Sequence, residues 1–528
     1  MTDLSNMLDA FQVADVDHSG VLDITVVRKL FTMLMPNVVE TEIDAMIKAA
    51  GAASCKGVHY ERFLRHIFGE CPNIQLRDTS FIFSMCDVTN SDTLDCSELR
   101  VALRALGFVP NQALLDKYVE TGKDLNERDF TSLVGILRKK MSVEMRCEAI
   151  VPHALRGISL GELEHVEQVF IDSGWLKKQC VNADGGENLY SIDAHIVKPL
   201  TQPGPCLARD QDIQSRFPKA THMTSFAELL NPHGRFSDYF VSHWWGHEFK
   251  KTMKSLRAWA KIHAGAIGKT SEHFVFWICL FALNQHKARE EVGSSPQTGP
   301  FNAALMRAKH GAIMVVGSTA NPFFRLWCIF EVHRAIALGK PFDLVSEHGD
   351  VGSITNLAVN GHKECSEFLR HISEVLPTVS ATRATANNPD DTFNILFDIM
   401  NPCVKQTALL TVRLKGLPYF LETVNQKRHS PLWWQDFNLR VKGLLAAPFF
   451  RACLTIGDGQ GALEWCAAGA PFGATELEQL DAMTCHHCVD FSNKDGKTLL
   501  QSAVSTGNLC GAKALLARGA DIEARHNN

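Results

Sequence analysis

The middle of the chain alternates apolar runs with amphipathic segments. The runs at 238–242, 274–283 and 312–318 are dominated by apolar residues, which is typical of strands that are buried on both faces. Apolar residues recur at helical spacing over 248–264, and further helices are expected over 301–311 and after the third run. This order predicts a parallel sheet covered by helices, with ligands bound beyond the carboxyl ends of its strands.

The first 140 residues show a different pattern, in which apolar helical faces flank acidic loops. The loop at 15–26 carries oxygen-bearing side chains at positions 1, 3, 5 and 9, which are Asp15, Asp17, Ser19 and Asp23. Gly20 occupies position 6, where the chain must turn sharply around a hard cation. Position 12 is Val26 where a bidentate Glu is expected, so we predict weak calcium affinity for this loop.

A second loop, at 87–98, has a more complete set of ligands for calcium. Its oxygen-bearing side chains are those of Asp87, Thr89, Ser91, Asp95 and the closing Glu98. Asp92 stands at the position that favours Gly, where it can adopt a left-handed conformation at some cost. We therefore expect this loop to be the better calcium site.

Two further units keep the same frame without a full set of acids. They lie at 51–63 and around 125–130, so that the four loops start at intervals of roughly 31–36 residues. The first 140 residues resemble a four-hand, calmodulin-like EF-hand domain, and this resemblance implies a helical fold that binds Ca²⁺. The alternative is a set of vestigial hands that keep the helical fold without a bound ion.

The C-terminal segment has the spacing of a helical repeat. Residues 493–528 place a turn, Thr498, Ala503, Gly507 and a final Gly-Ala-Asp at the offsets of an ankyrin repeat, and 441–474 resembles a divergent copy. The resemblance implies protein partners. Since two such repeats are marginally stable alone, the chain is expected to be a fragment of a longer array or to be covered by a partner.

Composition and charge narrow the class of protein. The 528 residues are 45% hydrophobic and 21% charged, with a net charge of −5, which gives no overall electrostatic case for binding nucleic acid. The longest strongly apolar run has ten residues, too few to span a membrane. The N-terminus lacks a signal-peptide pattern, and sixteen cysteines without a framework spacing are expected to be reduced. These features favour a cytoplasmic protein without a membrane span.

Polar and aromatic residues follow the predicted strands. His243, Trp244 and Trp245 come directly after the first strand, and Asn284 follows the second. The geometry of a parallel sheet is expected to gather them near the helix that carries Glu331. The plain alternative is that Glu331 is a solvated helix residue, paired with Arg334 one turn later.

The same segments resemble Toll/interleukin-1 receptor (TIR) domains. "DYFVSHWWG" is similar to their first strand, and "AIMVVGSTANPFFRLWCIFEV" is similar to their third strand, loop and helix, which opens with Trp-Cys and continues to a Glu. The match covers roughly 238–345. It implies a flavodoxin-like fold and, in the NAD-cleaving members, a catalytic role for the residue at Glu331. The sequences "HWW" and "NQH" depart from the family pattern, so substrate contacts do not transfer.

The proposed chemistry suits these residue types. Cleavage of a nicotinamide–ribose bond develops positive charge on the ribose, which a carboxylate stabilises, while an indole such as Trp244 or Trp245 can stack on the nicotinamide. His243, Trp244, Trp245 and Asn284 are therefore the candidate NAD-binding residues. A Cys328–His243 nucleophile is a weaker alternative because no third orienting partner is recognisable.

Together the patterns predict a multidomain α and α/β protein. The expected parts are an EF-hand domain (1–140), a connecting segment (141–225), a TIR-like sheet domain (226–430) and incomplete ankyrin repeats (440–528). The predicted function is calcium-binding signalling in which calcium or self-association controls NAD cleavage by the TIR-like domain. The alternative is a non-catalytic, calcium-responsive scaffold that binds proteins through its TIR-like and ankyrin surfaces.

Overall fold

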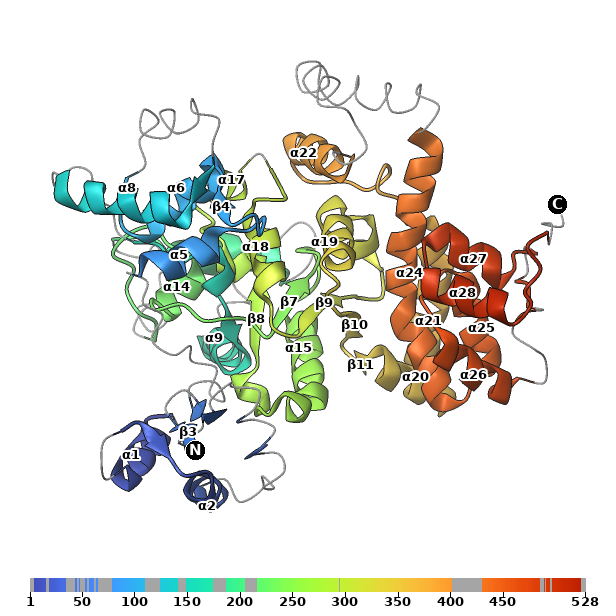
Figure 1. Cartoon of the computed structure of the whole chain (residues 1–528), viewed down its shortest axis with the longest axis horizontal. Helices are drawn as coiled ribbons and strands as arrows, with labels where there is room; N and C mark the ends of the chain where they lie inside the picture. The colour runs from blue at the N-terminus through green and yellow to red at the C-terminus, as the bar shows by residue number, and fades with distance from the viewer. Residues whose placement is uncertain are drawn as a thin grey trace. The chain divides into compact units, whose positions relative to one another are not determined.

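The structure is a computed structural model of the chain (Figure 1). It describes residues 4–15, 19–34, 43–44, 47, 53–54, 57–60, 63–64, 78–109, 124–140, 149–173, 187–204, 216–293, 295–400, 430–484, 489, 491–493 and 496–523. The contacts divide the chain into two compact units. The first unit comprises Met1–Phe240, Leu256–Gly293 and Thr298–Lys309, and the second comprises Val241–Ser255, Ser294–Gln297 and His310–Asn528.

Short antiparallel strands join the loops at the N-terminal end of the first unit. β1 (Val21–Leu22) pairs with β3 (Gly57–His59), which also pairs with β2 (Ala53–Ser54). β4 (Thr93–Leu94) pairs with β5 (Leu125–Asn126). Each acid-rich loop is thus linked to one of the acid-poor units that share its repeat frame.

The helices around these loops form two separate apolar cores. α1 (Leu4–Ala14) and α2 (Ile24–Leu34) flank the first loop, and Phe11, Phe31 and Phe63 are fully buried in the first core. The helices of the second core are α5 (Thr79–Cys86), α6 (Cys96–Ala105) and α8 (Glu127–Lys140). The predicted helix–loop–helix pattern is therefore observed on both sides of 15–26 and of 87–98.

The strands in the middle of the chain form one mostly parallel sheet (Figure 1). In spatial order they are β11 (Gly349–Asp350), β10 (Phe342–Ser346), β9 (Gly311–Val315), β7 (Tyr239–Ser242), β8 (Val275–Ile278) and β6 (Ile158–Ser159). β9 and β10 are parallel, whereas the edge strands β6 and β11 are antiparallel to their neighbours. The mixed α/β class predicted from the apolar runs is confirmed, and the two antiparallel edges were not predicted.

The second apolar run is only partly a strand. β8 ends at Ile278, and α16 (Cys279–Ala282) continues the apolar sequence as a single helical turn. The prediction of one strand over 274–283 is wrong in its second half, because an apolar run alone does not distinguish a buried strand from a buried helical turn.

The remaining helices lie between the strands of the sheet in sequence or follow the last strand, β11. In the first unit they are α9 (Leu160–Ser173), α11 (Leu189–Ile192), α12 (Lys198–Leu200), α14 (Phe226–Leu230), α17 (Ala288–Val292) and α18 (Pro300–Arg307). In the second unit they are α19 (Leu326–Ala337), α20 (Val351–Val359), α21 (Lys363–Val375) and α22 (Pro389–Met400). α15 (Phe249–His263) follows β7, close to the predicted helix at 248–264.

The C-terminal end of the second unit is a stack of helices. They are α24 (Ser430–Ile456), α25 (Gly459–Ala467), α26 (Ala474–Met483), α27 (Leu499–Thr506) and α28 (Leu509–Ala517). α24 packs against α25, and α27 packs against α28 and against both helices of the first pair (Figure 1). The buried Ser502 hydroxyl donates to the Cys466 and Ala467 carbonyls and fastens α27 to the end of α25. Both segments that resemble repeats thus form packed helical pairs.

Candidate functional site around Glu331

Glu331 lies on α19, the helix that follows β9. A short 3₁₀ turn, Asn321–Phe324, precedes the helix, and the extended backbone of Arg325 then starts it at Leu326. The Leu326 amide donates to the Thr385 carbonyl, so a neighbouring segment satisfies one amide that the first turn of a helix leaves unpaired. The start of α19 is thereby fixed in place.

The Glu331 side chain faces the interior. It is 5% exposed and shares the buried face of α19 with Cys328 and Val332. Within the described residues it forms no ion pair with Arg334. The alternative that Glu331 is a solvated helix residue is therefore wrong, because the helix turns this position toward the sheet.

Ser242, the last residue of β7, supplies the hydrogen bond to Glu331. Its hydroxyl donates to Glu331 Oε2, and its side chain is fully buried. Burial raises the pKa of Glu331 to about 8, and the Ser242 hydrogen bond lowers it only in part. At neutral pH the carboxyl group is therefore mostly protonated. The expected meeting of a strand end and the Glu331 helix is observed for β7.

His243 is next to Ser242 but does not supply a positive charge. Its Nδ1 lies 3.2 Å from the Val241 carbonyl oxygen, and burial lowers its pKa to about 4, so the ring is neutral at pH 7. The Cys328 thiol donates to the backbone carbonyl of His243 at 3.7 Å. This contact involves the main chain rather than the imidazole, and it gives no support to a Cys–His nucleophile.

Trp244 and Trp245 are half-buried in the turn after β7. The Trp244 indole lies over Gly246 so closely that a Cβ atom on Gly246 would be 2.1 Å from the ring. A second close approach follows, because a Cβ atom on Gly317 would be 2.7 Å from His247 Nε2. A larger residue at either position would require the facing aromatic ring to move.

Asn284 belongs to a polar cluster of the first unit. Its side-chain amide donates to the Met223 carbonyl at 2.9 Å, and its side-chain oxygen accepts from the His286 amide at 3.1 Å. Its backbone amide donates to Glu291. These bonds hold the loop after α16 in one conformation.

The loop at 87–98 brings several oxygens together. Thr89 Oγ1 lies 3.4 Å from Asp87 Oδ1 and 3.0 Å from Ser91 Oγ, so positions 1, 3 and 5 converge. The Glu98 carboxylate accepts from the Val88, Thr89 and Asp95 amides across the loop. Burial raises the pKa of Glu98, although these amide bonds lower it.

Asp95, another carboxylate of this loop, has a local role. Asp95 accepts from the Ser97 and Glu98 amides and caps α6. Asn90 and Asp92 both adopt left-handed conformations, with φ of 55° and 57° respectively. The loop thus combines a left-handed turn with side-chain oxygens that lie close together at positions 1, 3 and 5. Across the described ranges, no cluster of three or more His, Cys, Asp or Glu side chains is arranged to hold a metal ion.

The loop at 15–26 is more tightly filled by protein donors. The buried Asp15 carboxylate accepts from the Ser19 and Gly20 amides and from the Tyr60 hydroxyl. Asp23 is exposed and accepts from the Thr25 amide. Asp17 lies outside the described residues. No carboxylate stands at Val26, so the structure leaves this loop with the weaker ligand set predicted from the sequence.

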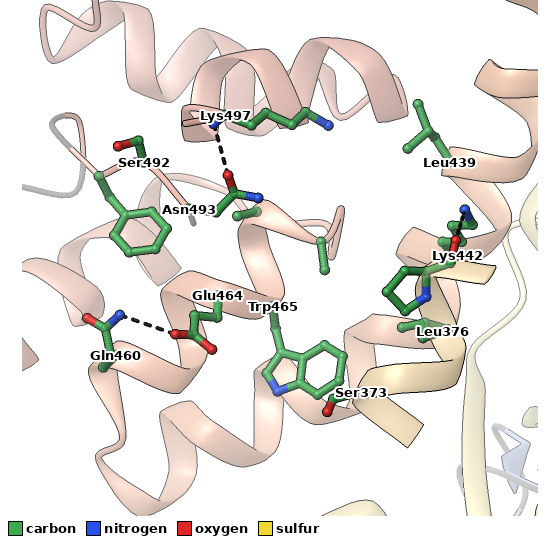
Figure 2. A pocket seen from close by; sticks show the side chains of 14 residues that line it. Ser373, Leu376, Leu439, Lys442, Gln460, Glu464, Trp465, Ser492, Asn493 and Lys497 are labelled. Carbon is green, nitrogen blue, oxygen red and sulfur yellow. Dashed lines mark hydrogen bonds between the residues drawn. The ribbon is translucent and has the colours of Figure 1, made fainter. Parts of the chain in front are cut away.

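A pocket of about 520 Å³ lies among the helices of the second unit, away from Glu331 in the chain (Figure 2). Its walls come from α21 and the following turn, from α24 and α25, and from the segment before α27. Sequence reasoning did not identify this pocket, because it depends on four segments that are distant in the chain.

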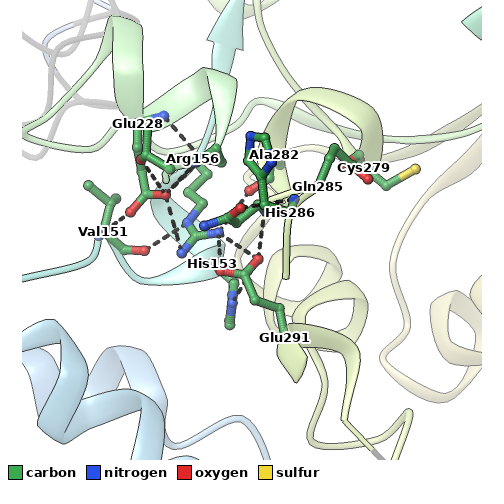
Figure 3. A network of polar contacts seen from close by, with 12 residues as sticks. Val151, His153, Arg156, Glu228, Cys279, Ala282, Gln285, His286 and Glu291 are labelled. Atoms are coloured by element: carbon green, nitrogen blue, oxygen red, sulfur yellow. Dashed lines mark hydrogen bonds and ion pairs between the residues drawn. The ribbon is translucent and has the colours of Figure 1, made fainter. Parts of the chain in front are cut away.

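A buried charge network in the first unit was also not predicted (Figure 3). The fully buried Arg156 side chain lies 2.9 Å from a Glu291 carboxylate oxygen and 3.5 Å from Glu228. It also donates to the Val151 and Ala282 carbonyls. Nothing in the local sequence marks Arg156 as buried; only the fold brings its two acidic partners, 72 and 135 residues away, into contact.

Comparison with known proteins found no similar protein. No protein-family model, curated protein or solved structure matches the chain. In the described part of the chain, every helix is too short or too polar to cross a lipid bilayer.

Proposed function

We propose that this is a cytoplasmic, calcium-binding signalling protein whose TIR-like region hydrolyses the nicotinamide–ribose bond of NAD, with Glu331 as the catalytic carboxylate. The observation that carries the proposal is the buried Glu331 side chain beside Ser242, at the end of a central strand. A carboxyl group with a strongly raised pKa in such a place is a candidate for a functional site. The sequence resemblance to TIR domains assigns the chemistry.

The raised pKa of Glu331 indicates a resting state in this proposal. A protonated carboxyl group does not stabilise positive charge on a ribose, whereas an ionised one does. Entry of substrate and water would lessen the burial that raises the pKa of Glu331 and favour the carboxylate. Activity is therefore expected only when the site opens.

Calcium would act through the contacts of the loop at 87–98. Val88 shares a small apolar cluster with Ala154 and Ala303, and Ser97 Oγ lies 3.1 Å from Thr298 Oγ1. Arg307, at the end of α18, donates to the Ser84 carbonyl of α5. A change in this loop would thus reach α18, and self-association of the TIR-like region is the proposed output.

The catalytic proposal is tested by measuring nicotinamide release from NAD. The full chain is assayed with calcium and with a chelator, at protein concentrations that span self-association. We expect release by the wild type with calcium, and a loss of at least 100-fold in Glu331→Ala. Glu374→Ala, which removes an exposed carboxylate, is the control and should retain activity. Undiminished release by the Glu331 variant would overturn the assignment.

The calcium proposal is tested separately by titration calorimetry of the full chain. Glu98→Gln keeps the shape of the side chain but removes a charged ligand, so it should weaken binding at least tenfold. Glu127→Gln, in the first turn of α8, is the matched control. The absence of any binding heat at millimolar calcium would reduce the N-terminal region to a structural role.

A non-catalytic scaffold is the second candidate. It is favoured by the 5% exposure of Glu331, which leaves little room for substrate in this conformation. It is also favoured by the exposed apolar side chains of Val504, Leu509 and Leu516 on the C-terminal helical pair, which suit a protein partner. The scaffold hypothesis predicts that calcium changes the sedimentation of the protein and that no assembly state releases nicotinamide from NAD.

A further inference from the structure

The pocket in the second unit combines a cationic side with an aromatic wall. Lys442 of α24 and Lys497 supply the cations, and Trp465 of α25 supplies an aromatic ring (Figure 2). Phe491 also lines the pocket. The pocket volume of about 520 Å³ is in the range of small-molecule sites. These residues come from three segments that only the folded chain brings together.

The two lysines are held by neutral groups. Lys442 Nζ donates to the Pro377 carbonyl at 2.5 Å, and Lys497 Nζ donates to the Ser505 hydroxyl at 3.0 Å. Neither ammonium group forms an ion pair with a carboxylate in the part of the chain that the structure describes. Within the described ranges, these two half-buried cations on one pocket have no acidic partner, which favours an incoming anion.

The electrostatic surroundings strengthen this argument. Burial lowers the pKa of Lys442, and positive charge on Arg383 and Lys497 lowers it further. Burial also lowers the pKa of Lys497. A bound anion would relieve the repulsion between these cations and return both pKa values toward their usual range.

The aromatic wall is fixed in position. The Trp465 ring stacks on Phe449 with centroids 4.6 Å apart and an interplanar angle of 20°. The one acid on the pocket wall, Glu464, is exposed and accepts from Gln460, and Figure 2 shows it turned away from Lys442. The cationic and acidic sides of the pocket are therefore separate.

We propose that this pocket binds a small organic phosphate that carries an aromatic ring, with the phosphate on Lys442 and Lys497 and the ring against Trp465. A phosphate offers several acceptor oxygens to two ammonium donors, and Lys is well suited to it as a point charge. A flat ring gains contact area on an indole.

Phenyl phosphate is the probe for the first test, titrated into the full chain by calorimetry. We expect saturable binding in the wild type, at least tenfold weaker in Lys442→Gln and in Lys497→Gln, and weaker in high salt. Inorganic phosphate and neutral phenol should each bind at least tenfold more weakly than phenyl phosphate. Lys513→Gln, an exposed lysine on α28, is the control and should bind as the wild type does.

Lysine labelling provides a second test that requires no variant. An acylating reagent at pH 8 should modify Lys442 and Lys497, and phenyl phosphate should protect them at least fivefold while Lys513 remains unprotected, as measured by peptide mass spectrometry.

Lys442→Arg and Lys497→Arg should bind phenyl phosphate almost as tightly as the wild type and so restore most of the binding that the Gln variants lose. The proposal is overturned if phenyl phosphate does not bind, if inorganic phosphate binds equally well, or if the Gln variants keep full affinity.

Discussion

Two buried glutamates show how the surroundings of a carboxyl group decide its charge. Glu291, in the first unit, and Glu331, in the second, are both almost completely buried. Burial alone would raise the pKa of Glu291, but the Arg156 guanidinium and His153 reverse this and hold it well below its usual range. Glu331 has the Ser242 hydroxyl and, among the described residues, no cation that lowers its pKa, which rises to about 8.

The difference separates an ionised buried carboxylate from a neutral buried carboxyl group. Glu291 is ionised, and its carboxylate accepts hydrogen bonds from the Arg156 guanidinium and from the Asn284 backbone amide. Glu331 is neutral in the resting fold and gains its charge only when its surroundings change. Similar burial of the two side chains therefore accompanies an ion-pair network in one region and a neutral carboxyl group that titrates near pH 8 in the other.

The largest effect is expected when the cation of the first network is removed. Arg156→Met leaves the buried Glu228 and Glu291 without the guanidinium charge that both face, which should cost about 3–5 kcal/mol of stability. Because the chain has several parts, the measurement should be local. Hydrogen exchange of peptides covering 149–160 and 284–292 should rise strongly, while peptides covering 441–467 should be unaffected.

A double-mutant cycle provides the control for this prediction. Glu291→Gln in the Arg156→Met background removes one of the two carboxylates that have lost their partner. The double variant should therefore be less destabilised than the sum of the two single variants. Strict additivity would mean that Arg156 stabilises the fold by packing rather than by charge.

Glu331→Gln is expected to change how stability depends on pH. Above pH 4.5 an unfolded Glu loses its proton, while the folded Glu331 keeps it up to about pH 8. The unfolded state then binds fewer protons, so wild-type stability should fall as the pH rises from about 4.5 to 8 and level off above that. The shift corresponds to a loss on the order of a few kcal/mol. The Gln variant should lack this slope.

Pulse proteolysis in urea at pH 5, 7 and 9 measures this difference. The two proteins should have similar urea midpoints for the α19 region at pH 5, and the variant should be the more stable at pH 9. Glu464→Gln, at an exposed position of α25, should follow the wild-type curve at all three values. A wild type whose stability does not change between pH 5 and 9 would show that Glu331 is hydrated in solution.

The sequence predicted helices and central strands better than it predicted the edge strands of the sheet. β7, α15 and α19 lie close to the predicted positions because each has a strong pattern of its own. β6 was missed because it has only two residues, and its pairing with β8 requires a partner more than one hundred residues away. Short edge strands have no periodicity that the sequence can show.

For the candidate site, the sequence predicted the position of Glu331 but not its burial. The order of strands and helices placed Glu331 near the end of β7, and the structure shows the Ser242 contact. The burial of Glu331 could not be predicted, because a single Glu in an apolar helix also suits a surface position. The partners of Asn284 could not be predicted either, because they come from distant segments. The EF-hand, TIR and ankyrin resemblances stay predictions.

A smaller effect is expected when Glu331 loses its hydrogen bond. Ser242→Ala removes the one contact that lowers the pKa of Glu331, so this pKa should rise above 8. The buried carboxyl group also loses a partner, which should cost about 1–2 kcal/mol. The pH at which stability levels off, measured by the same proteolysis assay, should move upward. Ser373→Ala, on α21, should leave it unchanged, and an unmoved plateau in the Ser242 variant would remove Ser242 from the site.

The smallest effect is expected at an exposed ion pair. Arg370 and Glu374 lie one helical turn apart on α21, 2.8 Å from each other, with both side chains more than half exposed. Solvent screens such pairs, so Glu374→Gln should cost only about 0.3–0.5 kcal/mol. The matched change at Glu291, which is buried against Arg156, should cost several times more when both are measured by urea-dependent proteolysis at pH 7. Equal costs at the two sites would mean that the Arg156 network is open to water, because only exclusion of water makes the same substitution expensive at one site and nearly neutral at the other.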